Sequence, residues 1–363
     1  MKSRKNLFQR GKSFLEKYER HLSSLALLLG FIIDSLTLRR IDLFIENAVI
    51  IGYLAVAAFC IVILNLNTVG RENFFRRMLE KIHPLILIVM QFAFGGLFSV
   101  FLVFYSRSAS LATSWPFLLI LFIHLIGNEV LKKQYTRFNL QVSIYFIALF
   151  SYCIFLLPVL IGKMGTGVFV LSGLASIILI SFFLFLLRFV VSYNRRVLFP
   201  LIAGVFLSIN FLYFANAIPP IPLSLKEVGV YHSISKTPEG EYVLQHEKER
   251  FIERFKSSRS IHVRQGDPLY IFSSIFAPTK IKTAVFHVWQ KQDSNGEWIS
   301  EEKTELPIVG GRDEGFRTYS LKRSLSPGLW RVNIETARGQ LIGRVKFEIF
   351  AVEALPQLSI KVR

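Results

Sequence analysis

The chain has 363 residues, of which 52% are hydrophobic and 14% aromatic, and its mean hydropathy of +0.45 excludes an ordinary soluble domain. The formal net charge is +18, but residues 1–222 hold 21 Lys and Arg against 8 Asp and Glu, whereas residues 223–363 hold 22 against 17. Basic residues in short membrane loops act as topology signals, so this charge argues against a nucleic-acid partner. Both cysteines, Cys60 and Cys153, lie in apolar segments, so we expect no disulfide in the soluble part, no metal site and no cofactor.

Seven apolar segments have about the length needed to cross a bilayer. A hydrocarbon core ~30 Å thick requires about 20 apolar residues in a helix. The segments cover residues 22–38, 43–66, 84–106, 110–131, 141–161, 166–192 and 197–218. The first is short and contains Asp34. The sequence therefore predicts a basic tail over 1–21, followed by a bundle of about seven transmembrane helices over 22–218.

Basic residues divide unequally between the two sets of loops that alternate along this bundle. The N-terminal tail and the loops near 71–81, 132–137 and 195–196 hold 16 Lys and Arg, whereas the other loops hold 4. Cytoplasmic loops carry the excess of Lys and Arg in membrane proteins. We therefore expect a cytoplasmic N-terminus and, after seven crossings, an extracytoplasmic C-terminal domain.

Three prolines, Pro219, Pro220 and Pro222, separate the bundle from this domain. Such a run cannot continue a helix, so an extended linker is predicted over 219–225. Short alternating stretches bounded by turn residues follow, near 228–235, 268–276, 282–290, 297–308, 315–323, 328–336 and 340–350. This spacing predicts an all-β, immunoglobulin-like sandwich over 226–352 and a tail over 353–363. Residues 246–258 are interpreted instead as a short charged helix.

Ionisable and amide side chains inside lipid are the natural places to look for function. The bundle offers Asp34, Glu46, His124, Asn128, Glu129 and Arg188. Asp34 and Glu46 lie near Arg39 and Arg40, so an interfacial ion-pair cluster explains them without transport or catalysis. The other four could form a proton relay or a polar substrate site, but hydrogen bonds between helices explain them equally.

Two features of the predicted β domain suggest ligand binding. The loop over 310–317 places four charged side chains among three glycines, and they could meet an anion or a cation, or pair with one another in a tight turn. The charged residues are Arg312, Asp313, Glu314 and Arg317. His287 and Trp289 lie on one predicted strand and could form an aromatic platform for a sugar, although Trp289 could equally fill the core.

Several strings of the C-terminal part resemble the bacterial family known as domain of unknown function 2914, over about residues 226–350. They occupy 270–278, 287–289, 310–320, 328–332, 335–336 and 339–343. The resemblance implies a bacterial envelope protein and brings no activity, substrate or catalytic residue with it.

The leading hypothesis is a multi-pass inner-membrane protein whose periplasmic domain binds an envelope component, either a glycan or an anionic lipid, or a partner protein. No catalytic motif supports an enzyme. A transporter or membrane-embedded enzyme with an accessory domain is the alternative, and a structural envelope scaffold is a third. The alternative requires Asp34, Glu46, His124 and Glu129 to line one cavity.

Overall fold

The computed structural model describes residues 31–32, 34–36, 43–66, 73–108, 111–130, 136–248, 258–279, 281–312 and 314–363. The chain forms two compact units, of which one holds most of the helical residues and the other includes Leu212–Arg363. Each unit is described here by itself.

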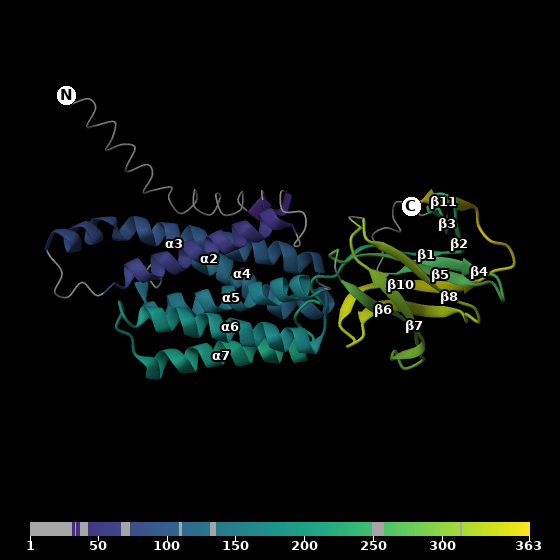
Figure 1. Cartoon of the computed structure of the whole chain (residues 1–363). Helices are drawn as coiled ribbons and strands as arrows, with labels where there is room; N and C mark the ends of the chain where they lie inside the picture. The colour runs from purple at the N-terminus through teal and green to yellow at the C-terminus, as the bar shows by residue number, and fades with distance from the viewer. Residues whose placement is uncertain are drawn as a thin grey trace, which may run out of the picture. The chain divides into compact units, whose positions relative to one another are not determined.

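The helical unit is built from long apolar helices (Figure 1). Their bounds are α2 (Phe44–Leu64), α3 (Asn73–Ser108), α4 (Leu111–Val130), α5 (Phe138–Ile161), α6 (Thr166–Leu187) and α7 (Arg195–Phe214). Five of the described helices are long and apolar enough to cross a membrane, namely α2, residues Leu85–Ser108 of α3, α5, α6 and α7. In α4 the apolar stretch is shorter, Thr113–Gly127. The first predicted span lies mostly outside the described residues, so seven crossings stay a prediction.

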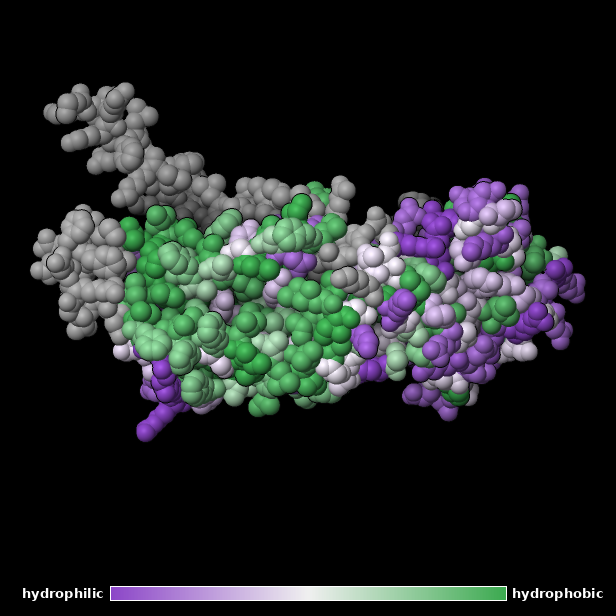
Figure 2. Space-filling model, viewed as in Figure 1, coloured by the Kyte–Doolittle hydropathy of each residue, from purple (hydrophilic) through white to green (hydrophobic). Residues whose placement is uncertain are grey.

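The surface of the helices suits lipid rather than water. Large apolar side chains such as Phe92, Ile178 and Phe211 are exposed, and the helical part in Figure 2 is correspondingly green. Between helices, the Asn65 amide donates to Gln141 at 2.7 Å and the Tyr152 hydroxyl donates to Asn47 at 3.1 Å. Polar side chains therefore link neighbouring helices, as expected where lipid offers no competing partner.

The C-terminal unit contains eleven strands in three sheets within the described residues. One sheet has the order β1 (Ser224–Tyr231), β5 (Leu269–Phe276), β8 (Phe316–Lys322). The largest has the order β4 (Arg259–Val263), β10 (Leu341–Ala351), β9 (Gly328–Thr336), β6 (Lys282–Gln292), β7 (Trp298–Val309). The third is β11 (Leu358–Val362), β3 (Tyr242–Glu247), β2 (Ser233–Lys236). Pairing is antiparallel except between β10 and β4.

The β1–β5–β8 sheet has apolar residues on both faces because β5 is buried on both sides. Ile271 and Ile275 of β5 pack toward the five-stranded sheet, together with Trp289, Trp330 and Phe347. Phe272 points the other way and packs with Tyr231 at the end of β1 and with Leu244 of the third sheet. Strand residues alternate between faces, so β5 supplies side chains to two separate cores.

Three predicted elements differ from the structure. The 219–225 linker is not an extended spacer: Leu223 N–H donates to Pro220 at 3.1 Å, and Ile221 and Leu223 are buried. The predicted helix over 246–258 begins in a strand, because His246 and Glu247 belong to β3, and 249–257 lie outside the described residues. The predicted tail contains β11, which pairs with β3. The immunoglobulin-like sandwich stays a prediction, and the third sheet was not part of it.

Candidate ligand-binding groove

His287 and Trp289, predicted to meet a ligand, lie in the interior. Both side chains are 0% exposed. The His287 ring is 2.9 Å from the Ser273 hydroxyl at Nε2 and 2.9 Å from the Ser320 hydroxyl at Nδ1, and Trp289 Nε1 donates to Ser320 at 3.1 Å. Burial lowers the pKa of His287 to about 4, so the ring is neutral and has one donor and one acceptor for the two serines. These residues join the sheets and offer no surface to a ligand.

Within the described part of the glycine-framed loop, one pair of its charged side chains is in contact. Arg317 donates to Glu314 at 2.6 Å, and the Arg312 guanidinium lies 5.6 Å from the centre of the Phe316 ring. The Glu314 side chain is 81% exposed, so this pair adds little stability. Asp313 lies outside the described residues. Ligand binding by Arg312 and Arg317 stays a prediction.

The intramembrane residues have separate partners. Asp34 accepts a hydrogen bond from Ser99, whereas His124 Nδ1 lies 2.7 Å from the Ile120 carbonyl and its ring packs on Phe98. Glu46 is buried, and its Oε2 has no hydrogen-bond partner among the described residues. Arg188 is exposed and lies over the rings of two phenylalanines, 185 and 189. The side chains of Asn128 and Glu129 lie outside the described part.

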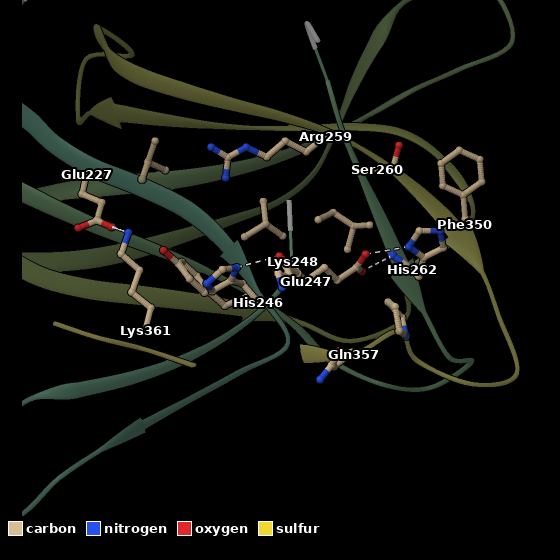
Figure 3. A pocket seen from close by; sticks show the side chains of 15 residues that line it. Glu227, His246, Glu247, Lys248, Arg259, Ser260, His262, Phe350, Gln357 and Lys361 are labelled. Atoms are coloured by element: carbon tan, nitrogen blue, oxygen red, sulfur yellow. Dashed lines mark hydrogen bonds and ion pairs between the residues drawn. The ribbon is translucent and has the colours of Figure 1, made fainter. Parts of the chain in front are cut away.

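A groove of about 990 Å³ opens on the C-terminal domain where β1, β3, β4, β10 and β11 approach one another. Its floor is apolar and includes Val228, Val230 and Ile261. Its polar and aromatic lining includes Glu227, Tyr231, His246, Glu247, Arg259, His262, Phe350, Gln357 and Lys361. Figure 3 shows the Glu227–Lys361 pair toward one end and the His262 and Phe350 rings toward the other.

Glu247 at the end of β3 is the best-connected side chain of the groove. Oε1 accepts from His232 Nε2 at 3.0 Å and from the His262 backbone N–H at 2.6 Å, while Oε2 accepts from His262 Nδ1 at 2.8 Å. Burial opposes the ionisation of Glu247, but these hydrogen bonds outweigh it and hold its pKa below the usual range. The ionised carboxylate only accepts, which places the ring protons on His232 Nε2 and His262 Nδ1.

The second carboxylate, Glu227 of β1, is held by the end of the chain. It accepts from Lys361 Nζ at 2.6 Å and from Arg363 Nε at 2.8 Å. Burial raises the pKa of Glu227, but Lys361 of β11 and Arg363, the residue that follows β11, together lower this pKa below its usual value. Both groove carboxylates are therefore ionised and paired, so they do not provide a vacant cation site. Within the described residues no group of three or more His, Cys, Asp or Glu can hold a metal ion.

Aromatic rings accompany these polar groups along the groove. Phe350 of β10 is 41% exposed and stacks on the His262 ring with 5.8 Å between centroids. Tyr231 meets His246 edge to face at 6.2 Å. Flat rings beside fixed hydrogen-bonding groups suit a ligand with one apolar and one polar face.

The groove was not predicted because three of the strands that build it, β3, β4 and β11, were not predicted. β3, β4 and β11 are only 6, 5 and 5 residues long and carry many polar side chains. In β3, polar and apolar residues do not alternate regularly: Val243, Gln245 and Glu247 share one face, and Leu244 and His246 share the other. The pair His246-Glu247 was the available signal, and it was assigned to a helix.

Residues 282–349, which span β6 to β10, match the family described as "Protein of unknown function (DUF2914)". This match confirms the resemblance seen in the sequence. It covers the strands of the five-stranded sheet other than β4, and it ends before the β11 wall of the groove. No curated protein matches the chain.

Likenesses to solved structures are distant. A β-glucosidase from Listeria innocua has 12% identity and a TM-score of 0.19, covering 35% of this chain and 16% of that enzyme. An immunoglobulin-like protein from Pseudomonas aeruginosa has 10% identity and a TM-score of 0.20, covering 34% of this chain and 97% of the other. An alkylpurine DNA glycosylase from Pseudomonas fluorescens has 10% identity and a TM-score of 0.21, covering 84% and 99%. Scores this low assign neither fold nor function to the chain, which spans only 16% of the length of the β-glucosidase.

Proposed function

Because residues 282–349 carry a DUF2914 domain that follows membrane-spanning helices, we propose that the chain is a bacterial inner-membrane protein that holds a glycan-binding domain outside the cytoplasm. The glycan of the cell envelope enters the groove beside Glu247. The observation that carries this proposal is the combination of a 990 Å³ groove, an exposed aromatic ring and a carboxylate fixed by three hydrogen bonds.

The distribution of basic residues supports the extracytoplasmic placement. Loops of one set hold 16 Lys and Arg and those of the other set hold 4. The segment Phe155–Val170, with Lys163 in the loop between α5 and α6, belongs to the same compact unit as Leu212–Arg363. A loop poor in basic residues is expected outside the cytoplasm, and the β domain is expected with it.

A sugar ring has an apolar face of C–H groups and a rim of hydroxyls, and the groove offers partners for both. Phe350 presents an exposed ring, the buried Tyr231 contributes to the lining, and Glu247, His262 and Gln357 supply hydrogen-bonding groups. His262 Nε2 is the free ring nitrogen when Nδ1 binds Glu247, so it accepts from a ligand hydroxyl when the ring is neutral. The fixed carboxylate reduces the entropy cost of orienting that imidazole.

The test measures binding of solubilised peptidoglycan fragments to the full chain in neutral detergent. Phe350→Ala removes a half-exposed ring. We expect the Kd of this variant for the fragments to be at least about fivefold higher than that of the native chain. Tyr319→Ala is the matched control, because Tyr319 is 39% exposed but lies on β8 and does not line the groove. Absence of binding by the native chain, or equal weakening by both variants, contradicts the proposal.

The transporter or membrane-enzyme alternative receives less support from the described residues. Asp34 bonds to Ser99, and His124 bonds within its own helix and packs on Phe98, so these two groups have separate local partners, whereas the buried Glu46 Oε2 has none among the described residues. These contacts favour the interhelical and intrahelical hydrogen bonding that the sequence also allowed. A structural scaffold is the outcome if neither glycan binding nor transport is found.

A further inference from the structure

A cluster of cations occupies the face of the five-stranded sheet that points away from the core. Trp330, Val332 and Ile334 of β9 are buried in the core, so the alternate residues Arg331 and Asn333 lie on the opposite face. Arg344 of β10 pairs directly with Asn333, and Lys346 pairs with Arg331. We call Arg331, Arg344 and Lys346 the arginine cluster. It lies inside the region that matches the DUF2914 family, and it shares no residue with the groove lining.

Neutral amides hold both guanidinium groups in place. Arg331 Nε donates to Gln290 Oε1 at 2.6 Å, and Arg344 Nε donates to Asn333 Oδ1 at 2.6 Å. The Asn333 amide group in turn donates to Gln290 at 3.3 Å and to Glu335 at 2.9 Å. The Nε–H group of each arginine thus makes a hydrogen bond that positions the side chain, and the terminal amino groups of the guanidinium remain for another partner.

The neighbouring carboxylate of Glu335 offsets the positive charge of the cluster only in part. None of its three residues forms an ion pair within 4.0 Å in the described ranges of the chain, whereas Arg264, Arg317 and Arg363 of the same domain each do. Burial lowers the pKa of both arginines, and the charge of Arg344 lowers that of Arg331 further, although Glu335 opposes this. Two partly buried guanidinium groups are therefore held near each other, and a bound anion would favour their charged forms.

Trp298 of β7 closes one side of the cluster. The Arg331 guanidinium lies 4.3 Å from its ring centre and Lys346 Nζ lies 5.9 Å away. Stacking on an aromatic face restricts the rotation of a guanidinium and keeps its donors in a fixed plane. The ring contact with Trp298 and the hydrogen bond to Gln290 thus both restrict the Arg331 side chain.

We propose that the arginine cluster is an oxyanion-binding site, which takes a phosphate or carboxylate group through the terminal amino groups of Arg331 and Arg344 with Lys346 adding charge. Bidentate pairing of guanidinium with an oxyanion is stronger than a neutral hydrogen bond and has a fixed geometry. The site does not depend on glycan binding in the groove.

The probe is inorganic phosphate, titrated against the full chain in neutral detergent and followed by phosphorus NMR line width. Binding by the native chain is expected to weaken at least about tenfold in Arg331→Gln and in Arg344→Gln. Arg264→Gln makes the same change of charge at an arginine that is already paired with Asp267 at 2.8 Å, and its Kd is expected to stay within about twofold of the native value.

Arg344→Lys keeps the charge and reports on the site if a glutamine variant does not fold. We expect it to bind phosphate more weakly than the native chain, because an ammonium group cannot form the bidentate pair. No binding by the native chain, an unchanged affinity in Arg344→Lys, or an equal loss in Arg264→Gln overturns the proposal. Nanodiscs of phosphatidylcholine and phosphatidylglycerol then distinguish the sources: weaker phosphate binding in the anionic discs assigns the site to a lipid headgroup, and equal binding assigns it to a soluble ligand.

Discussion

The His287 ring on β6 and the Ser273 hydroxyl on β5 form a 2.9 Å hydrogen bond between two sheets whose shared core is otherwise largely apolar. Ser320 on β8 completes the link from the other side of the ring. The His287 ring therefore links three strands of two sheets, and its two hydrogen bonds depend on the protonation state of the imidazole.

Acid should weaken the β domain through His287 before it affects the carboxylates. The folded pKa is about 4 and the ordinary value is 6.5, so the unfolded chain binds the proton first as the pH falls. Stability is then lost between pH 6.5 and about 4, by roughly 3 kcal/mol, and no further below that range. Pulse proteolysis of the full chain in urea across this range measures the loss.

The His287→Leu variant should lose about 1–3 kcal/mol at neutral pH, because two buried serines lose a partner, and its stability should be nearly flat from pH 6.5 to 4. The native chain and the variant therefore converge in acid. Ser320→Ala is the control, since it removes a partner but keeps the titrating ring and so keeps the slope. A His287→Leu chain that kept the native slope would show that another group is responsible.

Glu247→Gln should destabilise the groove in a different pH range. The folded pKa of Glu247 lies below its ordinary value of 4.5, so the carboxylate stabilises the fold above pH 4.5 and this contribution is lost as the pH falls through the folded pKa. Above pH 4.5 the variant should be less stable than the native chain by about 2 kcal/mol, because an amide cannot accept all three hydrogen bonds.

The matched control is Glu301→Gln, since Glu301 is an exposed carboxylate on β7. It is expected to change stability by less than about 0.5 kcal/mol at any pH. The same urea series serves both variants. A difference between Glu247→Gln and the native chain that persists unchanged well below pH 4.5 would show that its ionisation is not the cause.

Two glycines of the β domain should differ sharply when each is replaced by alanine. A Cβ at Gly310 would lie 1.8 Å from the Pro278 carbonyl oxygen, whereas a Cβ at Gly343 would lie 2.1 Å from the end of the flexible Leu225 side chain. Moving the Pro278 backbone aside costs more free energy than rotating the Leu225 side chain. We expect Gly310→Ala to cost about 3 kcal/mol or more and Gly343→Ala about 1 kcal/mol, measured as urea midpoints. Equal costs would contradict the contact at Pro278.

A reporter joined after residue 363 through a flexible linker tests the orientation. Alkaline phosphatase, which is active only outside the cytoplasm, should be active there, and a fusion within the loop near residues 132–137 should be inactive. The reason is the excess of Lys and Arg in that loop and its set. A fusion after 363 that is active only with a cytoplasmic reporter would overturn the extracytoplasmic placement.

The sequence predicted those parts of the fold that rest on long, regular patterns. The span predicted over 141–161 corresponds to α5 at Phe138–Ile161, and the strand predicted over 328–336 has the bounds of β9. Apolar length alone identifies the first, and strict alternation of Trp330, Val332 and Ile334 with polar residues identifies the second.

The candidate site could not be predicted because its residues come together only through pairing at long range. Glu227 and Lys361 are 134 residues apart, and the strand carrying Lys361 has five residues, too few for a periodic pattern. His287 was misassigned for a related reason. Alternation placed it on one face of β6, but only the packing of β5 against that face showed that the face is internal.

The pairing of β11 with β3 also bears on when the groove exists. Lys361 lines one wall of the groove, so the ribosome must translate past residue 361 before the site can assemble. The membrane helices and the five-stranded sheet are encoded earlier, and domains generally fold as units in the order of synthesis. A chain cut short near residue 351 would retain the arginine cluster but lack this wall. The arginine cluster can therefore form earlier in synthesis than the groove. A truncated chain would test the two proposed binding activities separately.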